Sequence, residues 1–441
     1  MWNKSFIYFP LDCSFYQNEI IAMTKVAGST KFAFIMITSL FFMWGFVHNL
    51  DPILIPHLKK SFSLSTLQSS LIDSAVFIAY FVMAIPAGYI MKQYGYKAGI
   101  ITGLCLFAIG SFLFIPAADT QQYSFFLGAL FVIACGLTIL ETAANPYASL
   151  LGDPASATQR LNFAQSFNGL AATLAPIIGA RMILVEGNSD EALQQMSTIA
   201  RQAALASEAA SVKTPYLVMG LVIVVIAIIF SFLKLPVIKE ESIDDGNKSF
   251  MHTLRHKHLR WAIVAQFFYV GAQVCVFSFF ILFAMKSAGL DKVKAADYLG
   301  WGCGMAFMIG RFAGTFFMRY IAPPKLLAIY SVCSILLSIA AITLTGMATV
   351  YAVIGIAFFM SIMFPTIFSL GIKDLESDTE MGSSLIIMSI VGGALLPSVL
   401  GYISDVTGNI QLGYIVPLLC FVVIFYFGWK GHQVQPTTKQ A

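Results

Sequence analysis

The sequence predicts an all-α polytopic membrane protein with twelve transmembrane helices. Of its 441 residues, 58% are apolar and only 11% are charged, whereas a soluble domain has roughly 45–50% apolar and about 25% charged residues. The apolar residues form unbroken runs such as 221–230, unlike the alternating strands of roughly ten residues in a membrane β-barrel. A spanning helix needs about 20 residues, so twelve helices would use a little over half of the chain. This composition excludes a soluble enzyme, a disulfide-rich secreted domain, a disordered protein and a nucleic-acid-binding protein.

Twelve apolar segments follow one another along the chain in two groups of six. We expect helices over residues 32–55, 70–91, 98–117, 124–150, 162–184, 214–234, 260–284, 296–318, 325–346, 348–371, 382–404 and 410–430. The resulting domain boundaries are a cytoplasmic N-terminal segment 1–31, a first half 32–235, a charged cytoplasmic linker 236–259, a second half 260–430 and a cytoplasmic tail 431–441.

The distribution of positive charge sets the expected orientation. With the N-terminus inside, seventeen Lys and Arg residues fall in inside segments and eight in outside segments. Cytoplasmic loops carry such an excess of Lys and Arg. We therefore expect both termini of this multi-pass protein to be cytoplasmic.

Short motifs recur in the two groups of segments at offsets of 219 to 226 residues. Two six-helix halves with the same inside–outside sense imply a parallel repeat about an axis normal to the membrane, as in the major facilitator fold. We therefore expect two pseudo-symmetric six-helix halves. The matching pairs are Ala87-Gly88 with Ala313-Gly314, Pro146 with Pro365, and Pro176 with Pro397.

Ionisable residues inside the apolar segments are the first functional candidates, because charge at membrane depth is costly. Glu141 lies in the fourth segment with no cation next to it in the sequence, so we expect it to bind and release a proton. His48 and Asp51 are three residues apart in the first segment and share a helix face. They are further proton-coupling candidates, with a packed histidine and a water-exposed carboxylate as the alternatives. Arg311, in the eighth segment, is expected to pair with a carbonyl or an acid between helices.

Carboxamides and aromatic side chains form the candidate substrate site. Such amides exchange paired hydrogen bonds with sugar hydroxyls, and an aromatic ring can pack on the apolar face of a pyranose. The alternative is that they only hold helices together, at about 0.6 kcal/mol each. The candidate substrate-binding residues are Trp44, Asn49, Asn145, Asn162, Gln165, Asn168, Tyr269 and Gln273.

Several stretches of the sequence form recognisable motifs, among them 44–54 (WGFVHNLDPIL), 140–146 (LETAANP), 160–168 (RLNFAQSFN), 269–273 (YVGAQ), 310–315 (GRFAGT) and 364–373 (FPTIFSLGIK). With these motifs, the sequence resembles the fucose–galactose–glucose permease family of the major facilitator superfamily. The resemblance extends from about residue 32 to residue 430. It implies sugar uptake coupled to protons, with Glu141 and an aspartate of the first helix as the proton-linked acids.

One departure from the family pattern concerns the first helix. The family motif is Asn-Asp-Ile-Leu where this chain has Asp51-Pro52-Ile53-Leu54. The aspartate is thus displaced by one position, which is about 100° of rotation on a helix. The sugar therefore stays open among L-fucose, galactose, glucose and an N-acetylhexosamine, and sodium stays open as the coupling ion.

We expect a secondary active transporter, a sugar–proton symporter that imports L-fucose or a related hexose by alternating access across a bacterial inner membrane. Its expected partners are the sugar, the coupling proton and the lipid bilayer. We expect a monomer that binds no nucleic acid, has no metal site and needs no cofactor beyond the coupling ion. A non-transporting nutrient sensor on the same scaffold is the main rival. We do not expect a membrane enzyme, because four of the six histidines lie in predicted loops or the tail.

Overall fold

The computed structural model describes residues 31–47, 49, 62, 66–183, 195–210, 212–233, 235 and 250–434. Within these ranges the regular structure is helical throughout. Eight helical stretches in them are long and apolar enough to cross a membrane. One of these stretches holds two predicted segments. Of the remaining three, 32–55 corresponds to a shorter apolar helix, 162–184 to a more polar helix, and 296–318 to a stretch that is divided among several short elements.

The first half is built from six long helical segments and one short helix. The two segments predicted over 70–91 and 98–117 are two helices that share the label α3 and meet at Gly95, whose φ of 79° is not helical and is a conformation that glycine adopts readily. The helices are Lys31–Val47, α3 (Thr66–Thr120), α4 (Tyr123–Leu150), α5 (Ala157–Ile183), α7 (Thr198–Ala210) and α8 (Lys213–Phe232).

The second half also accounts for its six predicted segments, several of which are divided into shorter helices. For example, the predicted segment 296–318 consists of the end of α12, a π-helical turn and α13. The elements are α9 (Phe250–Thr253), α10 (Lys257–Ser278), α11 (Phe280–Ala288), α12 (Lys292–Asp297), η2 (Tyr298–Gly304), α13 (Met305–Phe317), α14 (Pro323–Thr343), α15 (Met347–Met360), α16 (Met363–Gly371), η3 (Glu376–Asp378), α17 (Thr379–Met388), η4 (Ser389–Val391), α18 (Gly392–Thr407), α19 (Ile410–Gly413), α20 (Ile415–Tyr426) and η5 (Phe427–Gly431).

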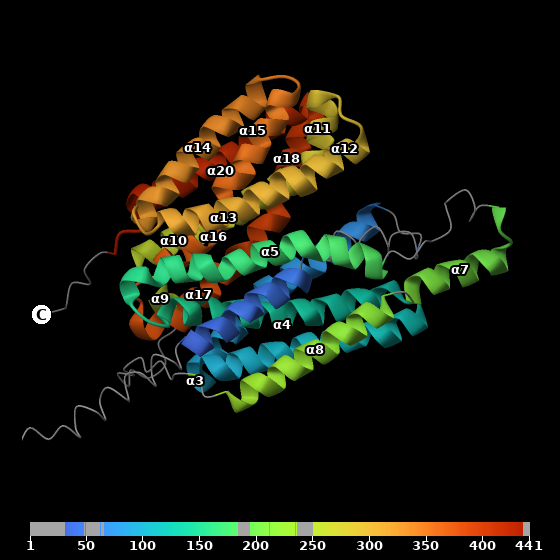
Figure 1. Cartoon of the computed structure of the whole chain (residues 1–441), viewed down its shortest axis with the longest axis horizontal. Helices are drawn as coiled ribbons and strands as arrows, with labels where there is room; N and C mark the ends of the chain where they lie inside the picture. Colours follow the sequence, from blue (N-terminus) through green and yellow to red (C-terminus); the bar gives the residue numbers. More distant parts are fainter. Residues whose placement is uncertain are drawn as a thin grey trace, which may run out of the picture.

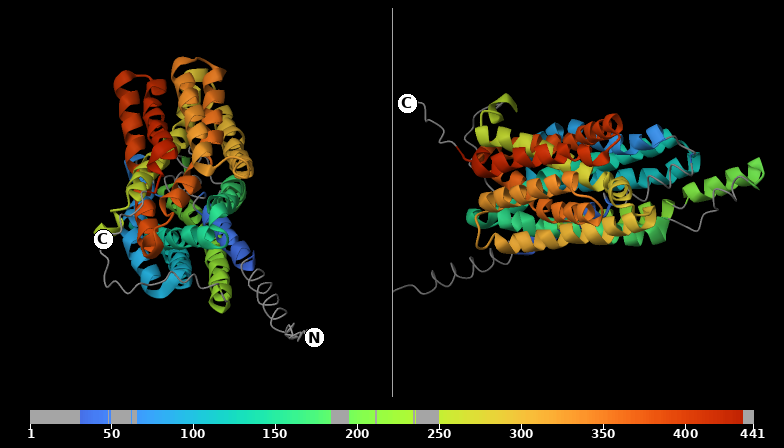
Figure 2. Two further views of the ribbon diagram at one scale, coloured as in Figure 1. Left: turned by 90° about the vertical axis from the view of Figure 1, so that its left-hand side faces the viewer. Right: turned by 90° about the horizontal axis from the view of Figure 1, so that it is seen from above.

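The two halves lie side by side as separate groups of helices (Figures 1 and 2). Helices α3, α4 and α8 lie on one side, α14, α15 and α20 lie on the other, and α5 and α13 run along the boundary (Figure 1). We use the name linker end for the end of the bundle at which α8 finishes and α10 begins. The opposite end, where α8 begins and α10 finishes, is the far end.

Close contacts join the two halves near the linker end, and we call them the seam. Gly88 of α3 packs against α17, where an added Cβ would overlap the Ser384 hydroxyl. The neighbouring Ser383 hydroxyl donates to the backbone oxygen of Thr142 in α4 at 2.8 Å. At the start of α5, the hydroxyls of Thr158 and Ser369 lie 2.9 Å apart. Small residues and hydroxyl groups therefore allow the halves to meet backbone against backbone, as is common between membrane helices.

An arginine fixes the turn between α4 and α5. Arg160 donates to the backbone oxygens of Ala148 and Ser149 at the end of α4. The same guanidinium donates to the backbone oxygen of Asp153 and to the Ser156 hydroxyl within the turn. The relative positions of α4 and α5 are thus fixed at the linker end.

Histidines hold the chain where it enters the second half. His252 Nδ1 and His256 Nε2 lie 3.1 and 3.3 Å from Asp378 Oδ2. His258 Nε2 lies 2.9 Å from the backbone oxygen of Lys373. Asp378 directly precedes α17, so these contacts fix the loop that leads into a seam helix.

The glycine at the seam gives a first prediction. Because the Cβ of an alanine at position 88 would overlap Ser384, Gly88→Ala is expected to separate α3 from α17 and cost about 1–3 kcal/mol of stability, as overpacking does. The thermal midpoint of the detergent-purified protein measures this loss. Ser384→Gly should restore much of it in the double variant. Gly128→Ala is the matched control, because nothing lies within 4 Å of a Cβ added there. Equal midpoints for the two alanine variants would contradict close packing at Gly88.

Candidate functional site

Glu141 of α4 is held by two neighbours in the first half. The Tyr80 hydroxyl, from α3, donates to Glu141 Oε1 at 2.7 Å. Asn145 Nδ2 donates to the backbone oxygen of Glu141 at 2.9 Å. Among the described residues, no Lys, Arg or His nitrogen lies within 4.0 Å of the carboxylate. A carboxylate that accepts a hydrogen bond from a phenol and has no cationic partner can take up a proton without breaking an ion pair.

A chain of hydrogen bonds leads from Glu141 across the boundary to the second half. Gln165 Nε2 of α5 donates to Asn145 Oδ1 at 2.9 Å. Arg311 Nη1 of α13 then donates to the backbone oxygen of Gln165 at 2.6 Å, and Arg311 Nε donates to the backbone oxygen of Ser361 at 2.8 Å. The predicted residues Asn145 and Gln165 are therefore brought together next to Glu141, and Arg311 connects them to the other half.

The Arg311 side chain is almost fully buried, with 4% of its surface exposed. No carboxylate among the described residues lies within 4.0 Å of it. Its guanidinium lies over the Phe307 ring, 4.7 Å from the centroid. The prediction that Arg311 pairs with a carbonyl between helices is confirmed, because it donates to carbonyls on both sides of the boundary.

Asn162, Gln165 and Asn168 recur every three residues and form a polar stripe along α5 that makes different contacts at its two ends. Asn162 is fully buried, and its Nδ2 donates to the backbone oxygen of Thr158 at 2.9 Å and to the Thr366 hydroxyl at 3.1 Å. Thr366 belongs to α16, so Asn162 contributes to the seam. Asn168, two turns further along the helix, is only half-buried and lies next to Gly45.

Gly45 allows the first helix to approach α5 closely. A Cβ added at Gly45 would lie 2.6 Å from Asn168 Nδ2. The backbone N–H of Asn49 continues the helical turn by donating to the Gly45 oxygen at 3.1 Å, and its side-chain Nδ2 donates to the same oxygen at 2.6 Å. Trp44 is 2% exposed and packs against Phe41 at a centroid distance of 4.2 Å. The structure thus places Asn168 of α5 beside the first helix and Asn49 one turn after Gly45, whereas the Trp44 ring lies within the apolar core.

The two candidate substrate-binding residues of α10, Tyr269 and Gln273, differ in burial. Tyr269 is fully buried, lies 6.2 Å from the Phe364 ring and interacts electrostatically with Arg311. Gln273, one turn further, is half-buried. Tyr269 therefore adjoins the Arg311 end of the hydrogen-bond chain.

His48 and Asp51, the other two proton-coupling candidates, lie outside the described residues. Their assignment stays a prediction.

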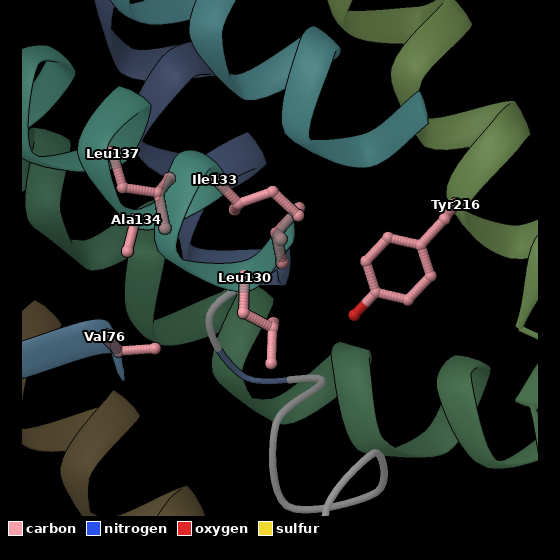
Figure 3. Close-up of a pocket in the computed structure, with 7 residues that line it drawn as sticks. Val76, Leu130, Ile133, Ala134, Leu137 and Tyr216 are labelled. Atoms are coloured by element: carbon pink, nitrogen blue, oxygen red, sulfur yellow. The ribbon is translucent and has the colours of Figure 1, made fainter. Parts of the chain in front are cut away.

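A small cavity lies inside the first half (Figure 3), and none of the candidate polar residues lines it. Its lining is apolar except for the Tyr216 hydroxyl. We therefore place the candidate site at the polar chain between the halves rather than in this cavity. The lining residues are Val47, Val76, Leu130, Ile133, Ala134, Leu137 and Tyr216.

Sequence reasoning missed Tyr80. It is one of seventeen tyrosines, and its contact joins residues 61 positions apart in the chain. The available signal was its spacing: Tyr80, Ala84 and Gly88 recur every four residues and share one face of α3.

Comparison with known proteins supports this architecture. Residues 33–383 match the family model of the Major Facilitator Superfamily. The chain is 42% identical over 417 residues to the L-fucose-proton symporter of Escherichia coli (strain K12), covering 92% of this chain and 95% of that protein. It is 42% identical over 416 residues to a glucose/galactose transporter of Brucella abortus biovar 1, covering 94% and 97% of the two chains.

Solved structures show the same similarity in three dimensions. The crystal structure of a major facilitator superfamily transporter, FucP, in the outward conformation superposes with a TM-score of 0.86 at 41% identity, covering 92% of this chain and all of that one. A proton:xylose symporter, XylE, superposes with a TM-score of 0.67 at 12% identity, which reflects a shared fold alone.

Proposed function

The chain belongs to the Major Facilitator Superfamily, and from this premise we propose that it is a sugar–proton symporter that works by alternating access. The observation that carries the proposal is the Glu141 carboxylate, which bonds to a phenol and has no cation partner among the described residues. Ionisable groups in membrane helices mark ion and proton pathways. The names of the relatives, an L-fucose-proton symporter and a glucose/galactose transporter, support the same class of substrate.

The excess of Lys and Arg supports a cytoplasmic location for the linker end. The seam then closes the cytoplasmic side of the bundle, through contacts such as Ser383 with Thr142 and Thr158 with Ser369. This arrangement agrees with the similarity to FucP in its outward conformation. We further propose a multi-pass monomer in a bacterial inner membrane, with both termini cytoplasmic and with the domain boundaries given above.

Transport would proceed as follows. In the outward-facing state Glu141 takes up a proton, and the neutral site then accepts sugar. Asn145 and Gln165 bond to one another in this structure, so sugar hydroxyls would compete for these amides, while Asn168 and Gln273 are the more exposed partners. The two halves then rock, the seam opens, and sugar and proton leave on the cytoplasmic side.

Gradient-driven uptake tests the proposal. Purified protein in proteoliposomes is supplied with radiolabelled L-fucose, D-galactose, D-glucose or N-acetyl-D-glucosamine under an imposed proton or sodium gradient. We expect one or more of these sugars to accumulate when the proton gradient is present, and a protonophore to abolish the accumulation. Accumulation under a sodium gradient alone would show that the coupling ion is sodium and not the proton. Binding without uptake under either gradient would favour a nutrient sensor and contradict the proposal.

A further inference from the structure

Tyr80 is positioned to act on the proton site, although nothing in its sequence context assigns it a role. Its side chain is 3% exposed. Its hydroxyl donates to Glu141 Oε1 at 2.7 Å from a neighbouring helix. The phenol is thus a specific, buried hydrogen-bond donor to the acid that the proposed mechanism protonates and deprotonates.

The same face of α3 also reaches the seam. Tyr80, Ala84 and Gly88 are spaced four residues apart, so they lie in line along the helix. Ala84 is fully buried, and Gly88 packs against Ser384 of α17. A movement of α3 that changes the distance from Tyr80 to Glu141 would therefore also change the contact between the halves.

Helix α17 approaches the proton site from the other side of the boundary. The Ser383 hydroxyl donates to the backbone oxygen of Thr142, which is the residue after Glu141. Glu141 is therefore linked to two helices that define the closed linker end. Helix α3 contacts its carboxylate through Tyr80, and helix α17 contacts the backbone oxygen of the next residue, Thr142.

We infer that Tyr80 is a positioning residue for proton coupling: its hydroxyl stabilises ionised Glu141 and thereby links release of the proton to the position of α3. A hydrogen bond donated to the charged form of an acid favours that form. The phenol keeps its own proton throughout. When Glu141 is protonated, the contact weakens, because a neutral carboxyl oxygen is a poorer acceptor than a carboxylate. This inference rests on the proposed function.

The test compares pH profiles of uptake. Tyr80→Phe removes the donor and leaves the ring, so Glu141 should hold its proton to higher pH. A hydrogen bond to a charged group corresponds to about a tenfold change in proton affinity or more. We therefore expect the pH profile of proton-driven uptake to move to higher pH by about one unit, whereas sugar exchange at equal proton concentrations is retained. Tyr330→Phe is the matched control, because Tyr330 is a buried tyrosine of the second half whose hydroxyl has no hydrogen-bond partner among the described residues.

A second variant keeps the test decisive if the phenylalanine protein folds poorly. Incorporating 3-fluorotyrosine at position 80 makes the phenol a stronger donor and should move the profile in the opposite direction, to lower pH. A purely structural tyrosine would not give shifts of opposite sign. A profile that coincides with the wild type in both variants would overturn the inference.

The role of Tyr80 can be separated from that of Glu141. In a Glu141→Gln background, Tyr80→Phe should cause no further change in sugar exchange. If Glu141→Gln itself still concentrates sugar, the proposed proton site is wrong. If Glu141→Gln loses coupling but Tyr80→Phe leaves the pH profile unshifted, only the inference about Tyr80 is wrong.

Discussion

In the Glu141→Gln variant, sugar is expected to equilibrate across the membrane and no longer to accumulate against its concentration gradient. The amide has nearly the same shape as the carboxyl group, and its oxygen can still accept the hydrogen bond from Tyr80. It cannot bind and release a proton, so a proton gradient no longer drives transport. Sugar exchange between labelled and unlabelled pools needs no net proton movement and should persist. Steady-state accumulation and exchange in the same proteoliposomes measure the two effects.

The matched control for this prediction is Asp405→Asn, which neutralises a carboxylate that lies exposed on the second half. It should accumulate sugar as the wild type does. Uphill accumulation by Glu141→Gln would show that another group, such as Asp51, carries the coupled proton. Loss of both accumulation and exchange would instead indicate that Glu141 contributes mainly to sugar binding.

Arg311→Lys is the second substitution for which a large effect is expected. The guanidinium bonds two carbonyls that belong to different halves, Gln165 and Ser361. A lysine keeps the charge but has one nitrogen in place of the planar fork that reaches both oxygens. Loss of one hydrogen bond to a charged group costs about 1.5–3 kcal/mol, so we expect the initial uptake rate to fall about tenfold or more.

Initial rates at saturating sugar, together with the thermal midpoint, test this expectation. Arg319→Lys is the control, because Arg319 is exposed and lies over the Phe316 ring at the linker end. It should retain the wild-type rate. A wild-type rate for Arg311→Lys would mean that a point charge suffices, and that the double contact with Gln165 and Ser361 does not position the halves.

Much of the fold follows from sequence pattern because each membrane segment carries its own signal. Runs of apolar residues locate the helices, and the recurring motifs predict two similar halves. The predicted boundary between 70–91 and 98–117 is confirmed at Gly95, where the backbone turns to a positive φ. Divisions such as that between α15 and α16 were not predicted, because a short irregular turn leaves the apolar run intact.

The candidate site was partly predictable because some of its residues, like the membrane segments, carry a signal in the sequence itself. Glu141 and Asn145 are one turn apart, so their proximity follows from helix geometry alone. The bond from Gln165 to Asn145 needs α4 and α5 to pack with a particular rotation, but both residues are conspicuous polar groups in apolar segments. Tyr80 and Thr366 are not conspicuous, since tyrosine and threonine are ordinary in membrane helices. Only the packing of distant segments identifies them as partners of Glu141 and Asn162.

The arginine that fixes the turn between α4 and α5 has a consequence for tolerance of insertions and deletions. Arg160 bonds four oxygens in and around a turn of only a few residues, so the register of α5 relative to α4 is set there. One residue inserted directly after Arg160, within the helix, would rotate the rest of α5 by about 100° relative to the anchored turn, turning Asn162 and Gln165 away from their partners together. Such an insertion would thus remove several contacts that no single substitution removes. The spacing between Arg160 and the polar residues of α5 is therefore as constrained as the identity of those residues.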